Sequence, residues 1–393
     1  MKVLIISPWF SEKMGYAENH LPVAFGKSGI EVHLLTSDLQ VYATSPDYDK
    51  IYRSYLGPKQ VDQGTFIRDG YTLHRHGHRI TSKGEVEILA IEEKIKTIRP
   101  NLVYTFDILL PETIVAANLK KRYGYQLFTE SRLHKSVFTP PKSKIKFWKQ
   151  YLHGYRLSKK INVFYPVAPD VQEVITKYFG VPSTKCTLSS LAVATDIFKV
   201  PEGSMVSASR EQLGFKADEI VCIYTGRFTD TKSPITLARA IDHLQEQGYE
   251  QFKGVFVGAG DPSYVQQIRE QRGCHVHDFV PSDQLPLWYG MSDIGVWPKE
   301  ESNSQLDALA CGLPIVISDR VEDVFRTEGC GLSYHQEDPI HLAHQLLALK
   351  DPQKRRQMSK VGSQKIKQYY SWDVIAKERL ETYQKNKQKK HRS

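Results

Sequence analysis

Short apolar runs alternate with helix-length segments along this chain, and the alternation begins twice. The first set of predicted strands comprises Lys2–Ser7, Val32–Thr36, Leu102–Phe106, Leu127–Glu130 and Val163–Val167. The second set comprises Ile220–Thr225, Gly254–Val257, His275–Phe279, Ile294–Trp297 and Ile315–Ser318. Buried strands separated by helical segments are typical of parallel βαβ units. The fold class predicted is therefore α/β, with two doubly wound, Rossmann-like domains and ligands at the carboxyl ends of the strands.

The length of the chain supports the same division. At 393 residues it exceeds the size at which a single hydrophobic core keeps growing. We expect an N-terminal domain at 1–199, a C-terminal domain at 200–370 and a closing segment at 371–393, with a linker near Val200–Ser207. The last nine residues, KNKQKKHRS, are predicted to be a disordered basic tail.

Composition favours a soluble globular protein, with 40% hydrophobic and 25% charged residues. No apolar run approaches the roughly 18 residues of a membrane span, and MKVLIISPWF enters a strand too early for a signal peptide. We therefore expect a cytoplasmic protein. Five widely spaced cysteines without a CxxC pair argue against both a disulfide framework and a zinc site, and predict free, buried thiols.

The net charge is +9, and one stretch of the first half is basic without any acidic residue. The stretch 132–160 contains nine Lys and Arg residues, interleaved with aromatic residues, and no Asp or Glu. This pattern suits the anionic face of a membrane or a phosphate-bearing acceptor. A solvated helix whose aromatic residues belong to the core explains it equally well. Nucleic acid is disfavoured because no recognition motif accompanies the charge.

Residues 299–319, KEESNSQLDALACGLPIVISD, contain the most informative local pattern. Ser302, Asn303 and Ser304 are helix-capping residues that precede a predicted helix, which ends at Gly312 before a buried strand. The exposed N–H groups and the dipole of such a helix suit a phosphate. Asp307, one turn into the helix, can accept hydrogen bonds from the two hydroxyls of a ribose. A capped helix without a ligand remains the alternative.

A second pattern follows the strand Ile220–Thr225. In TGRFTDTKS, Arg227 and Lys232 lie in the loop beyond the strand, where two cations can neutralise a pyrophosphate without a metal. The later segment VFVGAGDPS has Gly258 and Gly260 but lacks the third glycine of a dinucleotide fingerprint, which argues against NAD. Close approach of the backbone is the better explanation of those glycines.

His74, His76 and His78 alternate along one predicted strand and would share a face. Arg75 and Arg79 lie beside them and no carboxylate accompanies them. The sequence therefore predicts no metal site here.

In this order, the segments resemble those of the retaining group 1 (family 4) glycosyltransferases of the GT-B architecture. The resemblance spans nearly the whole chain and rests on MKVLIIS with a glycine loop, YPVAPDVQEVITKYFGVP, LAVATDIFK, TGRFTDTKS, GAG, DFVPSDQLPLWYGMSDIGVWP and DALACGLPIV. Each segment is weak alone and the ordered set is strong. It implies two Rossmann-like domains facing each other across a cleft, and a last helix after SWD that crosses back onto the first domain.

The resemblance also implies roles for individual residues. Arg227 and Lys232 would hold the donor diphosphate, and Asp307 stands where a glutamate usually binds the ribose. The other implied donor-binding positions are Gly15, Gly226, Gly258, Ser302, Asn303, Ser304 and the backbone around Val280. Glu130 falls where many members carry a histidine facing the transferred sugar, and capping of the segment after its strand is the alternative role for Glu130.

The sequence departs from the family pattern at two places. Members commonly have two glutamates eight positions apart, but counting back from Asp307 gives Lys299, beside Glu300 and Glu301. The first carboxylate is thus Glu300, Glu301 or absent. LAVATDIFK also lacks the usual asparagine and glycine. Because of these departures, a non-catalytic member of the family is an alternative.

The reaction implied is transfer of a sugar from a UDP- or GDP-sugar to a glycan or lipid-linked acceptor, with retention of anomeric configuration. No covalent nucleophile is evident, so front-face attack is expected, without a metal or other cofactor. Surface polysaccharide, glycolipid or glycoconjugate assembly is the expected context. The alternatives are a non-catalytic subunit that binds nucleotide or a partner, and another enzyme on the same architecture, such as a sugar-nucleotide epimerase or a phosphorylase.

Overall fold

The computed structural model describes residues 1–82, 84–190, 192–299, 301–321 and 324–392. The chain forms two compact units. Unit 1 comprises Met1–Leu191 and Asp373–Ser393, and unit 2 comprises Ala192–Trp372. Unit 2 is therefore inserted, in sequence, between the two parts of unit 1.

Unit 1 contains a seven-stranded sheet in the order β3-β4-β2-β1-β7-β8-β9. Its strands are β1 (Lys2–Ile6), β2 (Glu31–Ser37), β3 (Gly64–Arg68), β4 (Tyr71–His76), β7 (Leu102–Phe106), β8 (Gln126–Ser131) and β9 (Val163–Pro166), with a small hairpin of β5 (His78–Ile80) and β6 (Val86–Ile88). Its helices are α1 (Ala17–Lys27), α2 (Tyr48–Ile51), α3 (Arg53–Leu56), α4 (Ile91–Ile98), α5 (Pro111–Tyr123), α6 (Lys144–Ser158), α7 (Pro169–Phe179) and α15 (Trp372–Arg392), besides the 3-10 turn η1 (Ser183–Lys185). All neighbouring strands of the large sheet are parallel except β3 and β4.

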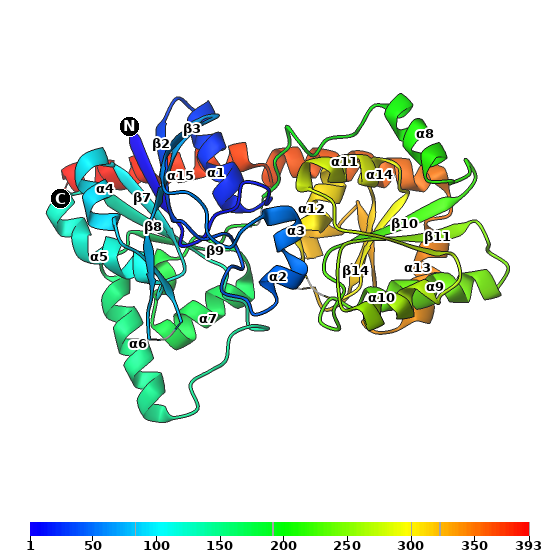
Figure 1. Cartoon of the computed structure of the whole chain (residues 1–393), viewed down its shortest axis with the longest axis horizontal. Coiled ribbons are helices and arrows are strands. Elements are labelled where there is room, and N and C mark those ends of the chain that lie inside the picture. The colour runs from blue at the N-terminus through cyan, green and yellow to red at the C-terminus, as the bar shows by residue number, and fades with distance from the viewer. Residues whose placement is uncertain (83, 191, 300, 322–323, 393) are drawn as a thin grey trace. The chain divides into compact units, whose positions relative to one another are not determined.

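Unit 2 contains a six-stranded parallel sheet in the order β12-β11-β10-β13-β14-β15. Its strands are β10 (Ile220–Thr225), β11 (Phe252–Val257), β12 (Cys274–His277), β13 (Ile294–Trp297), β14 (Ile315–Ser318) and β15 (Gly331–Tyr334). Its helices are α8 (Gly203–Gln212), α9 (Pro234–Glu246), α10 (Pro262–Arg269), α11 (Leu285–Gly290), α12 (Asn303–Ala310), α13 (Pro339–Ala348) and α14 (Pro352–Tyr369), with 3-10 turns η2 (Ser282–Gln284) and η3 (Val324–Arg326). Helices cover both faces of the sheet (Figure 1). Numbered along the chain within unit 2, this order is 3-2-1-4-5-6, that of a Rossmann fold.

The predicted strands are confirmed, and most of their apolar runs are buried; β12, at an edge of the second sheet, is the exception, since His275 is exposed and its other residues are half-buried. Every residue of β7, β10, β13 and β14 is buried. Two predictions about connecting segments are wrong. The expected linker near Val200–Ser207 contains the start of α8, and the closing basic residues continue α15 to Arg392 instead of forming a disordered tail. Lys and Gln are good helix formers, which explains the continuation.

The first and last residues of unit 2 are joined by backbone hydrogen bonds. The Val193 amide donates to the Tyr370 carbonyl at 2.7 Å, and the Trp372 amide donates to the Val193 carbonyl at 3.1 Å. These bonds form an isolated parallel bridge between Val193 and Ser371. The segment that enters unit 2 and the segment that leaves it therefore lie side by side.

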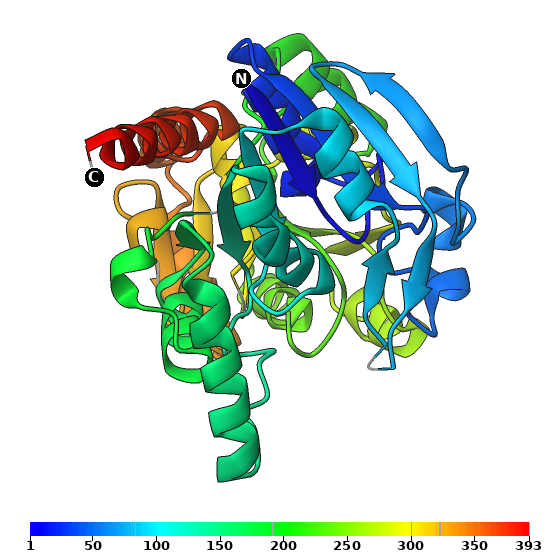
Figure 2. The same ribbon diagram turned by 90° about the vertical axis from the view of Figure 1, so that its left-hand side faces the viewer.

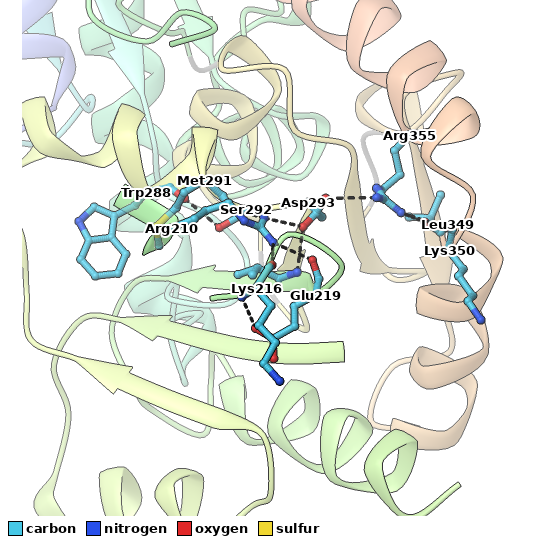
Figure 3. Close-up of polar contacts among 11 residues, drawn as sticks. Arg210, Lys216, Glu219, Trp288, Met291, Ser292, Asp293, Leu349, Lys350 and Arg355 are labelled. Atoms are coloured by element: carbon cyan, nitrogen blue, oxygen red, sulfur yellow. Dashed lines mark hydrogen bonds and ion pairs between the residues drawn. The ribbon is translucent and has the colours of Figure 1, made fainter. Parts of the chain in front are cut away.

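A half-buried charge cluster joins α8, α14 and the starts of β10 and β13 at the amino ends of the strands of unit 2 (Figure 3). Asp293, just before β13, accepts from Arg210 of α8 at 3.0 Å and from Arg355 of α14 at 3.2 Å. It also accepts from the Val221 amide at the start of β10. Because ligands bind at the carboxyl ends of parallel strands, this cluster has a structural role.

In the parts of the chain that are described, no helix is both long enough and apolar enough to cross a membrane. The five cysteines are unpaired; Cys222, Cys311 and Cys330 are buried as predicted, whereas Cys186 and Cys274 are only half-buried.

A histidine pair gives unit 1 a predicted dependence on pH. His74 of β4 lies 3.1 Å from His33 of β2, nitrogen to nitrogen, and is 7% exposed. Burial, with Lys94 and His33 nearby, lowers the pKa of His74 to about 4. The unfolded chain, with a pKa near 6.5, binds this proton more readily. The stability that His74 contributes is thus complete above pH 6.5 and is lost as the pH falls towards 4.

Between pH 7 and pH 4 we expect this proton to cost unit 1 about 3 kcal/mol of unfolding free energy. Urea unfolding at several pH values gives the unfolding free energy of the wild type and of His74→Gln as a function of pH. The variant should lose less stability than the wild type between pH 7 and pH 4. His153→Gln, which changes an exposed histidine of α6, is the matched control. Equal pH dependence in wild type and His74→Gln would contradict the assignment.

Candidate functional site

The candidate site of unit 2 lies where its strand order reverses, between β10 and β13. Strand β10 pairs with β11 on one side and β13 on the other, so the loops that follow β10 and β13 diverge at this point. In open α/β sheets such a switch point is where ligands bind. The loop after β10 contains Arg227 and Lys232, and the loop after β13 leads into α12. The two strongest sequence patterns therefore meet at one edge of the sheet.

Arg227 is exposed, and a hydrogen bond from Tyr224 holds its backbone. The Tyr224 hydroxyl donates to the Arg227 carbonyl at 2.9 Å. Among the described residues its guanidinium has no hydrogen-bond or ion-pair partner, so it is available to an anion. Lys232 is half-buried, and its ammonium lies 3.4 Å from the Glu301 carbonyl oxygen. Lys232 thus connects the loop after β10 to the loop after β13.

Gly258, at the end of β11, is required by a close approach of two backbones. A Cβ there would overlap the Gly226 carbonyl oxygen, and both residues have positive φ, 156° and 146°. The following residues reinforce the contact, since the Phe228 amide donates to the Ala259 carbonyl at 2.9 Å. The loop after β10 packs closely against the loop after β11, which explains these glycines. This is the close backbone approach that the sequence predicts.

Helix α12 begins and ends where the sequence predicts. Ser302 is its N-cap and accepts from the Ser304 amide, Asn303 is the first helical residue, and Gly312 follows its end with φ of 81°. Asp307 is half-buried on this helix, and burial raises the pKa of its carboxyl well above the usual range. Hydroxyl groups of a ligand would offset the loss of water around this carboxyl.

Arg326 supports the start of α12, and nothing in the sequence pattern points to it. Its guanidinium is 1% exposed and forms an ion pair with Glu301. It also donates to the Ser302 carbonyl at 3.1 Å and to Gln305 Oε1 at 3.0 Å. Glu301 is therefore occupied by a buried cation. Glu300, the other candidate for the first carboxylate, lies outside the described residues.

The remaining candidates of unit 2 lie in neighbouring loops. Val280 is half-buried in the segment between β12 and η2. Asp261, which follows the glycine segment, caps α10 by accepting from the Ser263 amide at 2.9 Å. The capping role of Asp261 is consistent with the argument against a dinucleotide at this position.

In unit 1, Gly15 and Glu130 lie beyond or at the carboxyl ends of strands. Gly15 is in the loop between β1 and α1 and is half-buried. Glu130, near the end of β8, is 3% exposed. Its carboxylate accepts from the Tyr104 hydroxyl and from Arg132 Nε, each at 2.8 Å. These bonds hold Glu130 in one orientation.

Across the described residues, no group of three or more His, Cys, Asp and Glu side chains could hold a metal. His74 bonds to His33 and Thr65, and His78 pairs with Asp38 at 2.5 Å. The prediction that the three histidines share one strand is wrong, because β4 ends at His76 and His78 begins β5 of the small hairpin.

Part of the chain matches a known family. Residues 219–351, which include β10 to α13 and hence the switch point, match the family described as Glycosyl transferases group 1. The chain contains a group 1 glycosyltransferase domain. A D-inositol 3-phosphate glycosyltransferase of Xylanimonas cellulosilytica is 26% identical over 228 residues, which is 54% of each chain. Spore coat protein SA of Bacillus subtilis is 27% identical over 197 residues, 45% of this chain and 52% of that protein. The chain thus spans about half the length of these curated relatives.

Solved structures share the fold over the whole length of the chain. Sucrose-phosphate synthase from Thermosynechococcus elongatus has a TM-score of 0.71 at 17% identity over 100% of both chains. Anabaena HepE in complex with UDP and glucose has a TM-score of 0.68 at 16% identity, covering 98% of this chain and 100% of that one. At this identity the likeness establishes the fold, and the GT-B architecture predicted from the sequence is confirmed.

Proposed function

We propose that this glycosyltransferase-family protein transfers a sugar from a nucleotide diphosphate sugar, with UDP or GDP as the nucleotide, to a glycan or lipid-linked acceptor with retention of anomeric configuration. The observation that carries the proposal is the convergence of Arg227, Lys232 and the start of α12 at the switch point of unit 2. Complexes of a protein of the same fold with UDP and with UDP-glucose support this class of donor.

Each group at this edge has a part in the proposed reaction. Arg227 and Lys232 stabilise the charge that develops on the leaving diphosphate, which favours departure without a metal ion. Ser302, Asn303 and Ser304 place the positive end of α12 towards a phosphate. Gly226, Gly258 and the backbone around Val280 shape the donor site. An oxygen of the donor phosphate accepts the proton of the attacking acceptor hydroxyl, so that no covalent intermediate is needed.

Gly15 and Glu130 remain the candidates on unit 1, the proposed acceptor side. A carboxylate held by Tyr104 and Arg132 at a strand end is suited to orient a sugar hydroxyl. The proposed setting is the assembly of a surface polysaccharide or glycolipid in the cytoplasm or at the inner face of the membrane.

A thermal-shift screen of UDP- and GDP-sugars tests the donor class, because a ligand that binds the folded state raises Tm by mass action. A binder should then be hydrolysed or transferred by the pure protein. A second candidate function is a non-catalytic subunit that binds nucleotide. Binding of a nucleotide sugar without hydrolysis or transfer, whichever acceptor is added, would favour it. The observation that favours this candidate is the occupation of Glu301 by Arg326.

Asp307→Ala is expected to weaken nucleotide binding by about 1–3 kcal/mol, because the ribose hydroxyls lose their acceptor. Asp307→Glu should preserve or improve affinity. Isothermal titration with the nucleotide found in the screen measures both variants. An unchanged affinity in Asp307→Ala would mean that Asp307 is only a helical residue.

We also propose that the stretch 132–160 contacts an anionic membrane or a lipid-linked acceptor through α6. Ile145, Trp148, Leu152 and Tyr155 follow one another at helical spacing and are 82%, 56%, 44% and 37% exposed. Lysines before and within this helix are exposed as well. In both views α6 extends away from the sheet of unit 1 (Figures 1 and 2). An apolar stripe beside cations is typical of a helix that lies in a membrane interface.

Reversing Lys142, Lys144, Lys146 and Lys149 to glutamate should abolish binding to anionic vesicles at low salt, because each basic residue near such a surface contributes roughly 1 kcal/mol. Nucleotide binding should not change. The matched control reverses four exposed lysines of α15, Lys377, Lys385, Lys387 and Lys389. Wild-type protein that ignores anionic vesicles, or equal loss in the control, would contradict the role of α6.

A further inference from the structure

A chain of buried polar groups crosses unit 1 around Glu130. Arg132 donates from Nε to Glu130 at 2.8 Å and from Nη1 to both oxygens of Glu18, on α1, at 3.2 and 3.3 Å. Its guanidinium also lies 4.3 Å from the centre of the Phe106 ring. One cation is therefore shared between two carboxylates whose side chains are 4% and 12% exposed.

The second cation of this region comes from the C-terminal helix. Arg379 of α15 is fully buried, with its guanidinium 3.5 Å from the centre of the Tyr165 ring. It donates to Ser189 Oγ at 2.5 Å. Tyr165 is the register partner of Glu130 on the neighbouring parallel strand, so this guanidinium lies on the face of the sheet that carries Glu130. On the same face the Tyr104 hydroxyl donates to Glu130 Oε2. The ion pair of Arg379 with Glu378, at 3.6 Å, involves a carboxylate that is 57% exposed and is correspondingly weak.

Two carboxylates share one cation in this region. Glu18 and Glu130 both pair with Arg132. A buried carboxylate without a compensating cation is strongly unfavourable. Arg379 is a second cation on the face of the sheet that carries Glu130.

A packing role alone does not explain this arginine. The Nε and Nη1 atoms of Arg379 are buried without a hydrogen bond. Unmade hydrogen bonds on a buried cation carry a cost that an apolar side chain of similar shape would avoid. The positive charge itself is therefore the property that this position requires.

We propose that Arg379 is a positioning residue for Glu130: helix α15 supplies the second cation, and the Tyr104 hydroxyl connects its effect to the carboxylate. Because α15 begins at the boundary between the units, the residues that follow unit 2 help to orient the candidate sugar-facing carboxylate of unit 1. An effect of Arg379 on catalysis rests on the proposed function of Glu130. The coupling between Arg379 and Glu130 does not depend on that function.

A double-mutant cycle on thermal stability tests the coupling without any ligand. Arg379→Met is expected to lower Tm by about 8 °C in the wild type but by less than about 3 °C in a Glu130→Gln background, where no uncompensated charge remains. Arg379→Lys, which keeps the charge, should recover at least half of the loss. Lys377→Met, at an exposed position of the same helix, should change Tm by about 1 °C or less.

Losses of equal size in both backgrounds would overturn the proposal, since packing on Tyr165 and the bond to Ser189 do not depend on Glu130. Failure of Arg379→Lys to recover stability would overturn it as well. Turnover of UDP-glucose gives a separate readout. If Glu130→Gln turns over at the wild-type rate while the stability coupling is present, the catalytic role of Glu130 is wrong and the positioning role of Arg379 stands.

Discussion

Replacing Arg227 or Lys232 by alanine is expected to lower the transfer rate by about 100-fold or more, as for loss of a group that stabilises transition-state charge. Both side chains lie at the switch point of unit 2, in the loop after β10, and Arg227 is exposed there. The fold should therefore remain intact. Initial rates at saturating donor measure the loss, and circular dichroism checks the fold.

Arg239→Ala is the matched control, because this arginine is exposed on the outer side of α9 and lies away from the loop. Its rate should equal that of the wild type. A chelator should also have little effect, since the two cations take the place of a metal in the proposed mechanism. Activity that survives both substitutions, or that disappears with EDTA, would contradict the proposed diphosphate site.

Removing the cation beneath α12 should have the largest effect on stability. Arg326→Met leaves the Glu301 carboxylate without its partner and the Ser302 carbonyl without a donor. Breaking a buried pair from one side typically costs about 3–5 kcal/mol, which corresponds to a fall in Tm of roughly 10 °C for a domain of this size. Differential scanning calorimetry measures the shift.

Arg320→Met provides the comparison, since Arg320 lies exposed a few residues earlier in the chain. It should change Tm by less than about 2 °C. Nucleotide affinity should also fall in Arg326→Met, because the loop before α12 loses its support. A Tm within about 2 °C of the wild type would show that Glu301 finds another partner and that Arg326 does not order this loop.

The central strands could be predicted because their signal is local. In β7, β10, β13 and β14 an uninterrupted apolar run is buried on both faces, and the predicted bounds equal the observed ones. The edge strands β3 and β15 carry no such signal. In β3 buried residues are absent, and Ile67 is 77% exposed. β15 is buried only at Tyr334, so its four residues do not stand out from a loop.

In the candidate site, too, the residues with a local sequence signal could be predicted and those held by distant contacts could not. Ser302, Asp307 and Gly312 were found through the rules for the start and end of a helix, which involve neighbours in sequence. Arg326 contacts residues more than twenty positions away, and Arg379 contacts Ser189 across 190 positions. Such pairs follow from tertiary packing, and neither arginine stands in a pattern that distinguishes it from a surface charge.

The bridge between Val193 and Ser371 means that unit 2 is an insert whose two ends meet. A segment of this kind can be excised or exchanged with little strain, because its host needs to span only a short gap. Cutting the gene at these two points would separate unit 2, Ala192–Trp372, and would allow the proposed donor-binding unit to be grafted between relatives. If the proposed function holds, donor and acceptor preferences could then be exchanged independently in such chimaeras.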